Sequence, residues 1–327
     1  MADAIVLRGL TKTFGSKVAV QDLDLVVPEG GLYGFIGPNG AGKTTTIRMI
    51  LSILFPDRGE IRVLGHPTAL EAKDRIGYLP EERGVYRKMK CGAFLAFMAR
   101  LKGAGGPNLR ANVRRWLARV GLAEVENKRC EELSKGMQQK LQFISAVIHE
   151  PALLVLDEPF SGLDPVNMRL MRDLVLEQKA RGATIIFSTH VMHQAEQICD
   201  HIVMIHGGRK VLDETLHGVR VKYDPRTILF EPLDPRADVE LLRGLPGVTG
   251  LKRKNGAYEI ELADGLTPAD ALARCAGCLP AARVALNRPT LEDVFIRIVT
   301  GGAGRDEEDA ERLRAALRDE AAAGARS

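Results

Sequence analysis

Long apolar runs are missing from this sequence of 327 residues, and no stretch approaches the roughly 18 uncharged apolar residues that a membrane-spanning helix requires. The first residues, Met1-Ala2-Asp3-Ala4, lack the basic start and the apolar core of a secretory signal. The five cysteines are odd in number and scattered, so they form no disulfide framework. These absences predict a reduced, cytoplasmic protein with no membrane span of its own.

A strong charge of one sign is missing too. The 46 Lys and Arg residues exceed the 42 Asp and Glu residues by only four, which is too small an excess to predict a nucleic-acid partner. We therefore expect no nucleic acid to bind. The composition, with 45% hydrophobic and 27% charged residues, is that of an ordinary globular protein, and the length predicts about two domains.

A glycine-rich loop near the N-terminus carries the clearest chemical signal. An apolar run at 32–36 predicts a strand before it, and apolar spacing at 44–54 predicts a helix after it. Loop and helix start fit G-x-x-x-x-G-K-[ST], whose backbone N–H groups and helix N-terminus bind phosphate. This context argues against a chance glycine-rich turn. The predicted nucleotide contacts are Gly37, Pro38, Asn39, Gly40, Ala41, Gly42, Lys43, Thr44 and Thr45.

Within that loop, Lys43 is expected to reach the β- and γ-phosphates, and the Thr44 hydroxyl to ligate Mg²⁺. A second element, the apolar run 153–156, predicts a buried strand that ends at Asp157 and Glu158. Ligands bind at the carboxyl edge of an open α/β sheet. We therefore expect Asp157 to hold Mg²⁺ through water and Glu158 to orient or deprotonate the attacking water. The alternative is that Asp157 and Glu158 are solvated loop residues without a function. The nearby phosphate loop, which needs a metal partner, favours the functional interpretation.

A histidine follows another apolar run, at 184–187, which predicts a neighbouring buried strand. His190 would lie at the same sheet edge, where its ring can hydrogen-bond the γ-phosphate and steady Glu158. The predicted catalytic residues are therefore Glu158 and His190.

Two segments carry a family resemblance. Leu133-Ser134-Lys135-Gly136-Met137 lies between the two nucleotide elements, and Ser161-Gly162-Leu163-Asp164 follows the second. They resemble the signature, usually Leu-Ser-Gly-Gly-Gln, and the D-loop of ATP-binding cassette (ABC) proteins. A phosphate loop is shared by many NTPases, but this pair is specific to ABC proteins.

Three further elements match the family in its order. Phe14 takes the place of the aromatic residue that stacks on adenine, residues 76–81 resemble the Q-loop, and His190 matches the switch histidine. The resemblance covers about Ile5 to Leu216. It implies an α/β fold, the P-loop NTPase nucleotide-binding domain of ABC proteins with a helical subdomain.

In that family the signature contacts ATP that is held by a facing protomer. The resemblance therefore implies a head-to-tail dimer, a homodimer or a heterodimer with a second nucleotide-binding subunit, with two ATP molecules in its interface. Lys43, Glu158 and His190 would come from one subunit of each site. The residues implied as ATP contacts from the signature and the D-loop are Ser134, Gly136, Met137 and Asp164.

The sequence departs from the family at two places. Glu81 replaces the Q-loop glutamine; its carboxylate can ligate Mg²⁺, which makes it a candidate metal ligand with Thr44 and Asp157. In the signature, Met137 cannot donate the hydrogen bonds of glutamine, and Lys135 adds a positive charge. These departures, with residues 82–86 and a small C-terminal domain, resemble the ATPase subunits of ABC-2-type exporters, including the sodium-efflux type.

The domain organisation follows from the shifts in pattern along the chain. We predict a nucleotide-binding domain at 1–217, with its helical subdomain at about 83–150, a small α+β domain at 218–300, and a flexible or helical tail at 301–327. The order β-α-β-β-α-β-α resembles a ferredoxin-like unit. Cys275 and Cys278 predict an incidental pair of reduced thiols rather than a zinc site, because no second metal pair accompanies them.

The function predicted is that of a Mg²⁺-dependent ATPase that powers a membrane exporter through ATP-driven dimerisation. Its permease would be a separate chain, so the protein would work at the inner face of the cell membrane. A cytoplasmic helix of the permease is expected near 81–90, and a solvated face is the alternative for the residues that would line this contact, which are Arg83, Tyr86, Arg87, Lys88 and Lys90.

Two other functions compete with the exporter. A soluble ABC ATPase acting on ribosomes or DNA fits less well. Only one cassette is present, and no heptad array lies between Lys43 and Ser134. A catalytically weak, regulatory cassette is opposed by the presence of Asp157, Glu158 and His190.

Overall fold

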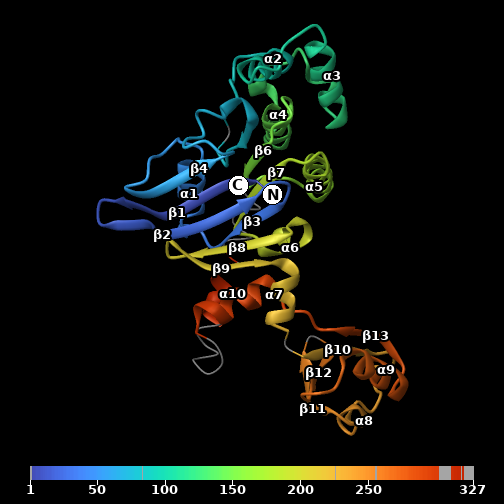
Figure 1. Ribbon diagram of the computed structural model, residues 1–327. Coiled ribbons are helices and arrows are strands. Elements are labelled where there is room, and N and C mark those ends of the chain that lie inside the picture. The colour runs from blue at the N-terminus through green and yellow to red at the C-terminus, as the bar shows by residue number, and fades with distance from the viewer. Residues whose placement is uncertain are drawn as a thin grey trace. The chain divides into compact units, whose positions relative to one another are not determined.

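The computed structural model describes residues 2–82, 84–224, 226–254, 256–301, 311–317 and 319 (Figure 1). The chain divides into two compact units. The first contains the residues up to Leu216 and those from Phe295 onwards, and the second contains His217–Val294.

A six-stranded sheet forms the centre of the first unit. Its order is β5-β6-β7-β3-β8-β9, and its neighbours pair in parallel except β9, which is antiparallel to β8. Every residue of β3, β6 and β7 is buried, which confirms the expected buried parallel strands. The strands are β3 (Leu32–Ile36), β5 (Ile76–Leu79), β6 (Leu153–Asp157), β7 (Thr184–Thr189), β8 (His201–His206) and β9 (Arg209–Thr215).

Four helices connect these strands: α1 (Lys43–Ile50), α4 (Lys135–Val147), α5 (Pro165–Ala180) and α6 (Met192–Ile198). The sequence pattern predicts a helix at 168–180, and the observed α5 begins three residues earlier. The Asp164 side chain caps it by accepting hydrogen bonds from the N–H groups of Val166 and Asn167, and Pro165 occupies the first position. Proline is favoured there because its missing N–H would have no partner within the helix.

An antiparallel sheet of order β2-β1-β4 packs over α1, and its inner face shares one apolar core with that helix and the six-stranded sheet. Burial alternates along β2, as a sheet with one solvated face requires. Its strands are β1 (Asp3–Phe14), β2 (Lys17–Pro28) and β4 (Arg58–Val63). The apolar residues at 5–7 and the alternating residues at 22–25 predict strands that lie within β1 and β2, whereas the sequence pattern does not predict β4.

The predicted helical subdomain consists of α2 (Cys91–Leu101) and α3 (Leu109–Arg119) beside α4, grouped at one end of the unit (Figure 1). Phe94 and Leu95 of α2 and Val113 and Trp116 of α3 are buried. The sequence pattern predicts helices at 93–101 and 109–120, and the observed starts of α2 and α3 lie within two residues of these positions.

The second unit contains a four-stranded antiparallel sheet of order β11-β12-β10-β13. Ile228, Phe230 and Ile260 of the sheet share a core with Leu242 of α8 and Cys275 of α9. The element order confirms the expected ferredoxin-like α+β arrangement. Its elements are β10 (Thr227–Pro232), α8 (Glu240–Arg243), β11 (Val248–Lys254), β12 (Ala257–Leu262), α9 (Pro268–Cys278) and β13 (Ala281–Leu286). The division between the two units falls within α7 (Leu216–Lys222) and α10 (Leu291–Val299).

Two further predictions concern the tail and the membrane. Residues 311–317 of the predicted tail are helical, and 302–310, 318 and 320–327 lie outside the described residues. Across the described residues, no helix is both long enough and apolar enough to cross a membrane.

Candidate functional site

The glycine-rich loop joins β3 to α1, and two of its glycines are required by space. A Cβ atom at Gly37 would lie 2.1 Å from the carbonyl oxygen of Ile205. Gly42 has a φ of 110°, and a Cβ atom there would lie 2.5 Å from the carbonyl oxygen of Ala19. Because Gly42 is also the N-cap of α1 and brings no side chain, the first turn of the helix is left open to an anion.

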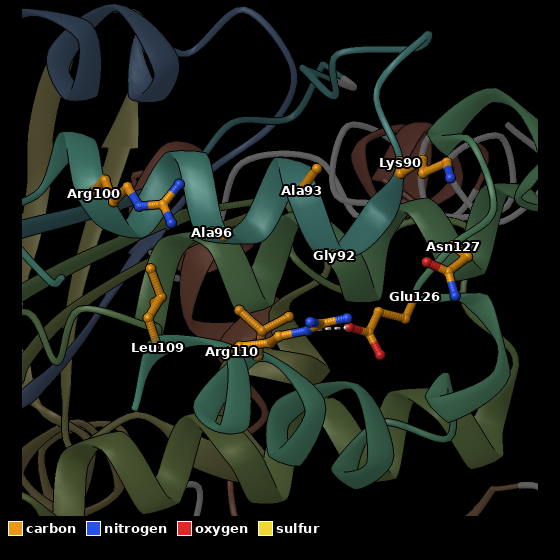
Figure 2. Close-up of a pocket in the computed structure, with 10 residues that line it drawn as sticks. Lys90, Gly92, Ala93, Ala96, Arg100, Leu109, Arg110, Glu126 and Asn127 are labelled. Carbon is orange, nitrogen blue, oxygen red and sulfur yellow. Dashed lines mark ion pairs between the residues drawn. The ribbon is translucent and has the colours of Figure 1, made fainter. Parts of the chain in front are cut away.

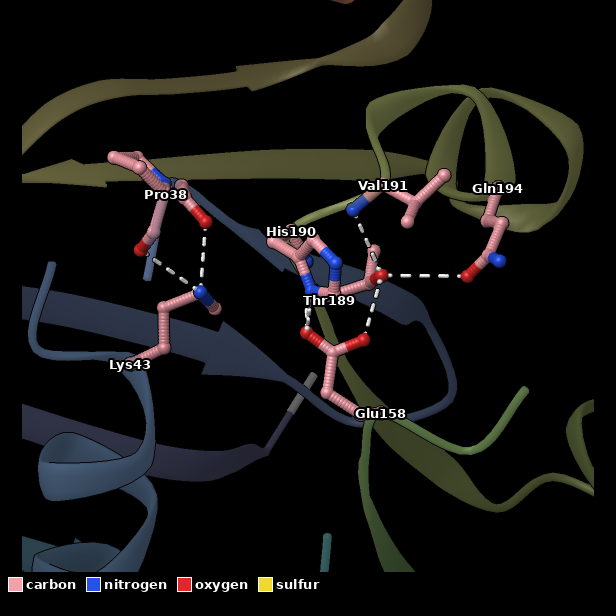
Figure 3. A network of polar contacts seen from close by, with 8 residues as sticks. Pro38, Lys43, Glu158, Thr189, His190, Val191 and Gln194 are labelled. Carbon is pink, nitrogen blue, oxygen red and sulfur yellow. Dashed lines mark hydrogen bonds and ion pairs between the residues drawn. The ribbon is translucent and has the colours of Figure 1, made fainter. Parts of the chain in front are cut away.

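Lys43 lies inside this loop and is only 6% exposed. Its ammonium group donates hydrogen bonds to the carbonyl oxygens of Gly37, at 2.7 Å, and Pro38, at 3.1 Å (Figure 3). The lysine is therefore held with its charge at the loop backbone, where phosphate oxygens of a nucleotide would bind.

A pocket of about 260 Å³ opens at the loop. It brings together the Phe14 side chain, the loop from Asn39 to Thr45, and the carboxylates of Glu81 and Glu158. Phe14 is half exposed, and Lys12 Nζ lies 5.6 Å from its ring centroid. Lys17 and Ala19 also line the pocket, although the sequence analysis did not select them. Their position after the β1–β2 turn, next to Phe14, was the available signal.

Asp157 ends β6 beside this pocket and is only 1% exposed. Neither of its carboxylate oxygens has a hydrogen-bond partner among the described residues. Burial raises the pKa of Asp157 to about 6, and the negative charges of Glu81 and Glu158 act in the same direction. The hydroxyls of Ser188 and Thr44 lower that pKa in part, although neither meets hydrogen-bond geometry with the carboxylate.

This donor set fits a Mg²⁺ ion. A cation would offset the buried charge of Asp157, and Thr44 and Glu81 would supply further oxygen ligands. The described residues contain no group of three His, Cys, Asp or Glu side chains able to hold a metal by themselves. Mg²⁺ commonly binds through one or two carboxylates together with the phosphates of its substrate, so a complete protein cage is not needed.

Glu158 follows β6 in a left-handed backbone conformation, with φ of 48°, and is 8% exposed. Its Oε1 accepts a hydrogen bond from the His190 backbone N–H at 2.8 Å and lies 2.6 Å from His190 Nδ1. Its Oε2 accepts a hydrogen bond from the Thr189 hydroxyl at 3.1 Å (Figure 3). The two predicted catalytic side chains are therefore in direct contact, because β6 and β7 are neighbours in the sheet.

The signature and D-loop residues line no part of this pocket. Ser134 is exposed and caps α4, accepting a hydrogen bond from the Met137 N–H at 3.3 Å. Asp164 is exposed as well, and its pKa lies below its usual value because Asn167 donates hydrogen bonds to the carboxylate from its backbone and its side chain. Within one chain, the structure thus separates Ser134, Gly136, Met137 and Asp164 from the other predicted nucleotide contacts.

A second cavity, of about 340 Å³, lies between α2 and α3, with Lys90 and Arg100 at opposite ends of the α2 segment (Figure 2). Gly92 forms part of its wall, and Arg110 and Glu126 form an ion pair of 3.6 Å across it. No residue of the predicted nucleotide site lines it.

The comparisons with known proteins agree with this geometry. Residues 20–161 match the family described as "ABC transporter", and residues 215–299 match the C-terminal domain of DrrA1-3-like ATP-binding proteins. The chain is 40% identical over 295 residues to the uncharacterized ABC transporter ATP-binding protein YhaQ of Bacillus subtilis (strain 168), covering 90% of this chain and 98% of that protein. The chain belongs to the ABC transporter ATP-binding proteins.

Another relative and a solved structure agree. The Nod factor export ATP-binding protein I of Burkholderia orbicola (strain AU 1054) is 34% identical over 311 residues, covering 93% of this chain and 98% of that protein. A solved ATP-binding subunit of an ABC transporter superposes with a TM-score of 0.63 at 31% identity, covering 67% of this chain and 93% of that one.

Family membership confirms several predictions. This ABC protein binds ATP and is an ATPase whose hydrolysis is coupled to transport, and its fold is the ABC nucleotide-binding domain with a small C-terminal α+β domain. The buried loop lysine and the contact between Glu158 and His190 are features of this chain that agree with such an activity.

Proposed function

We propose that this ABC ATPase powers export, and that two nucleotide-binding subunits close head-to-tail around two ATP molecules to do so. One observation carries the proposal. The phosphate-binding residues share one pocket, whereas the signature residues lie outside it, with Ser134 at the exposed start of α4. A second subunit would complete each site by facing its signature helix N-terminus towards the phosphate.

In this proposal the residues at and beside the pocket have separate tasks. Lys43 holds the β- and γ-phosphates, Phe14 stacks on the base, and Glu158 orients or deprotonates the attacking water. His190 fixes the Glu158 carboxylate through its backbone N–H and Nδ1. Bound Mg²⁺, held by Thr44, Asp157 and Glu81, would supply the charge that neutralises the phosphate oxygens.

The permease is proposed to be a separate membrane-spanning polypeptide that docks on the helical subdomain. Tyr86 and Phe97 are exposed, and their rings meet edge to face at 5.8 Å. Phe97 and Leu101 lie four residues apart on α2 and extend this apolar surface. It suits the apolar face of a cytoplasmic helix of the permease.

Charged residues surround that apolar surface. Arg87, Lys88 and Lys90 are exposed beside Tyr86, and they would pair with acidic residues of the helix. Arg83, which the sequence analysis also assigned to this contact, lies outside the described residues. The alternative is that these residues form a solvated face only.

The direction of transport and the location belong to the same proposal. The relative from Burkholderia orbicola carries export in its name. We assign the chain to the inner face of the cell membrane, where its permease would present the cytoplasmic helix. The permease would select the substrate.

The experiment that tests the proposal is the Glu158→Gln substitution. Removing the base while keeping the shape of the side chain should lower ATP turnover by at least about 100-fold. ATP binding should stay within twofold of wild type, and ATP should now trap a stable dimer, measured by light scattering after gel filtration. Glu60→Gln, an exposed carboxylate on β4, is the matched control and should turn over normally. Full turnover by Glu158→Gln would overturn the assignment of the base.

A further inference from the structure

The Thr189 hydroxyl stands between Glu158 and α6, and the proposed function gives it no task. Thr189 is the last residue of β7 and is fully buried. Its Oγ1 lies 3.1 Å from Glu158 Oε2 and 3.3 Å from Oε1 of Gln194, which is in the first turn of α6 (Figure 3). It also accepts a hydrogen bond from the Val191 N–H at 3.0 Å.

A hydroxyl has only one proton to donate. Thr189 therefore cannot donate to Glu158 and to Gln194 at the same time. Its oxygen is already directed by the Val191 N–H, so the remaining choice is the direction in which the proton points. The charged carboxylate is the stronger acceptor of the two, since hydrogen bonds to ionised groups are shorter and stronger than neutral ones.

The contacts on Glu158 come from two sides. Oε1 is held by His190, whereas Oε2 is held by Thr189. With one oxygen held alone, the carboxylate could still rotate about its last bond. With both held, its plane is fixed. Two contacts from His190 occupy Oε1, whereas Oε2 keeps a second lone pair beside its bond from Thr189, which leaves a place for a water molecule.

We propose that Thr189 is a positioning residue for ATP hydrolysis, which fixes the plane of the Glu158 carboxylate. Gln194 controls how strongly it does so, by competing for the hydroxyl proton. This inference rests on the proposed role of Glu158 as base. Thr189 does not line the nucleotide pocket, so it acts through Glu158 and touches no substrate in this role.

Gln194 is suited to this control because its amide is neutral. A carboxylate at position 194 would be as strong an acceptor as Glu158 and would draw the hydroxyl proton towards α6. The structure therefore predicts that Gln194→Glu releases Oε2 of Glu158 and acts in the same direction as loss of the Thr189 hydroxyl.

The test compares three variants at saturating ATP. Thr189→Val keeps the shape and removes the proton donor, so kcat should fall about tenfold, while KM for ATP changes by less than twofold. Thr189→Ser retains the hydroxyl and should restore kcat to within threefold of wild type. Thr184→Val is the matched control. It is buried at the other end of β7, where its hydroxyl accepts a hydrogen bond from the Gly30 N–H, and kcat should be unchanged.

A merely structural role would give a different result. If Thr189 only supports the Val191 backbone, then KM and the unfolding temperature should change with kcat, and Gln194→Glu should be neutral. Equal kcat values for Thr189→Val and wild type would overturn the proposal.

A double variant distinguishes a failure of this inference from a failure of the proposed role of Glu158. In the Glu158→Gln background, Thr189→Val should cause no further loss, because the group it positions has lost its basic oxygen. An additional tenfold loss there would show that Thr189 acts by another route. If Glu158→Gln alone turns over normally, the base assignment fails whatever Thr189 does.

Discussion

The two halves of the proposed ATP site differ in how far one chain completes them. The phosphate half is buried and internally bonded, with Lys43 tied to the loop carbonyls and Glu158 held by His190 and Thr189. The signature half lies outside this pocket, and the Ser134 hydroxyl there caps its own helix. The difference supports the proposal that one chain would hold nucleotide by itself, whereas a second subunit would complete the site for hydrolysis.

The largest effect is expected from a substitution in the phosphate half of the site. Lys43→Ala removes the buried ammonium group that lies at the loop carbonyls, so ATP affinity should fall by at least about 100-fold through the lost charge-assisted contacts. Binding of a fluorescent ATP analogue to the isolated chain measures it. Lys135→Ala removes an exposed lysine from the signature half and should bind normally. Equal losses in both variants would contradict the division into halves.

The next largest effect is expected from a substitution in the signature half of the site. A Cβ atom at Gly136 would lie 3.5 Å from Leu163 Cδ2, an ordinary contact, so a side chain fits in the isolated chain. Gly136→Glu would then place a negative charge towards the phosphates of the facing subunit. Turnover and ATP-dependent dimerisation should fall by about tenfold or more, from repulsion between like charges. Binding to the isolated chain should stay within twofold. A matching loss of binding would contradict the proposal that Gly136 acts in trans.

A smaller effect is expected at the edge of the phosphate pocket. Phe14 ends β1 and is half exposed, and stacking of an aromatic ring on a base stabilises binding by roughly 1–3 kcal/mol. Phe14→Ala should therefore weaken ATP binding about tenfold, and Phe14→Tyr should keep it. Isothermal titration with ATP and with inorganic triphosphate separates loss of stacking on the base from a general loss of phosphate binding. Triphosphate has no base, so it should bind wild type and Phe14→Ala with equal affinity.

The sequence predicted the residues of the phosphate loop better than it predicted the contacts and elements around them. Residues 37–45 are consecutive, so their spacing alone indicated phosphate binding. The contact between Thr189 and Gln194 depends on the side-chain geometry where β7 turns into α6, which no short motif encodes. Strand β4 was missed because its charged residues break the apolar pattern, while pairing with β1 holds it in the sheet. The early start of α5 came from the Asp164 cap rather than from periodicity.

The smallest effect concerns the link between the two halves. His149 follows the signature helix α4, and its Nε2 lies 3.2 Å from the Ile76 carbonyl oxygen of β5, the strand that leads to Glu81. Burial, and then the charge of Lys102, lowers the pKa of His149 to about 4. In the unfolded chain the histidine titrates near its ordinary value of about 6.5.

The difference between these two pKa values makes the free energy of unfolding depend on pH. Between those two pKa values the unfolded chain binds the proton more readily, so the stability that neutral His149 provides is present above about pH 6.5 and is lost as the pH falls towards 4. His149→Gln retains a donor for the Ile76 carbonyl oxygen but cannot titrate. The free energy of unfolding from urea titrations should therefore drop more for wild type than for the variant between pH 7 and pH 5. The two slopes would be equal if the histidine were solvated in the folded protein.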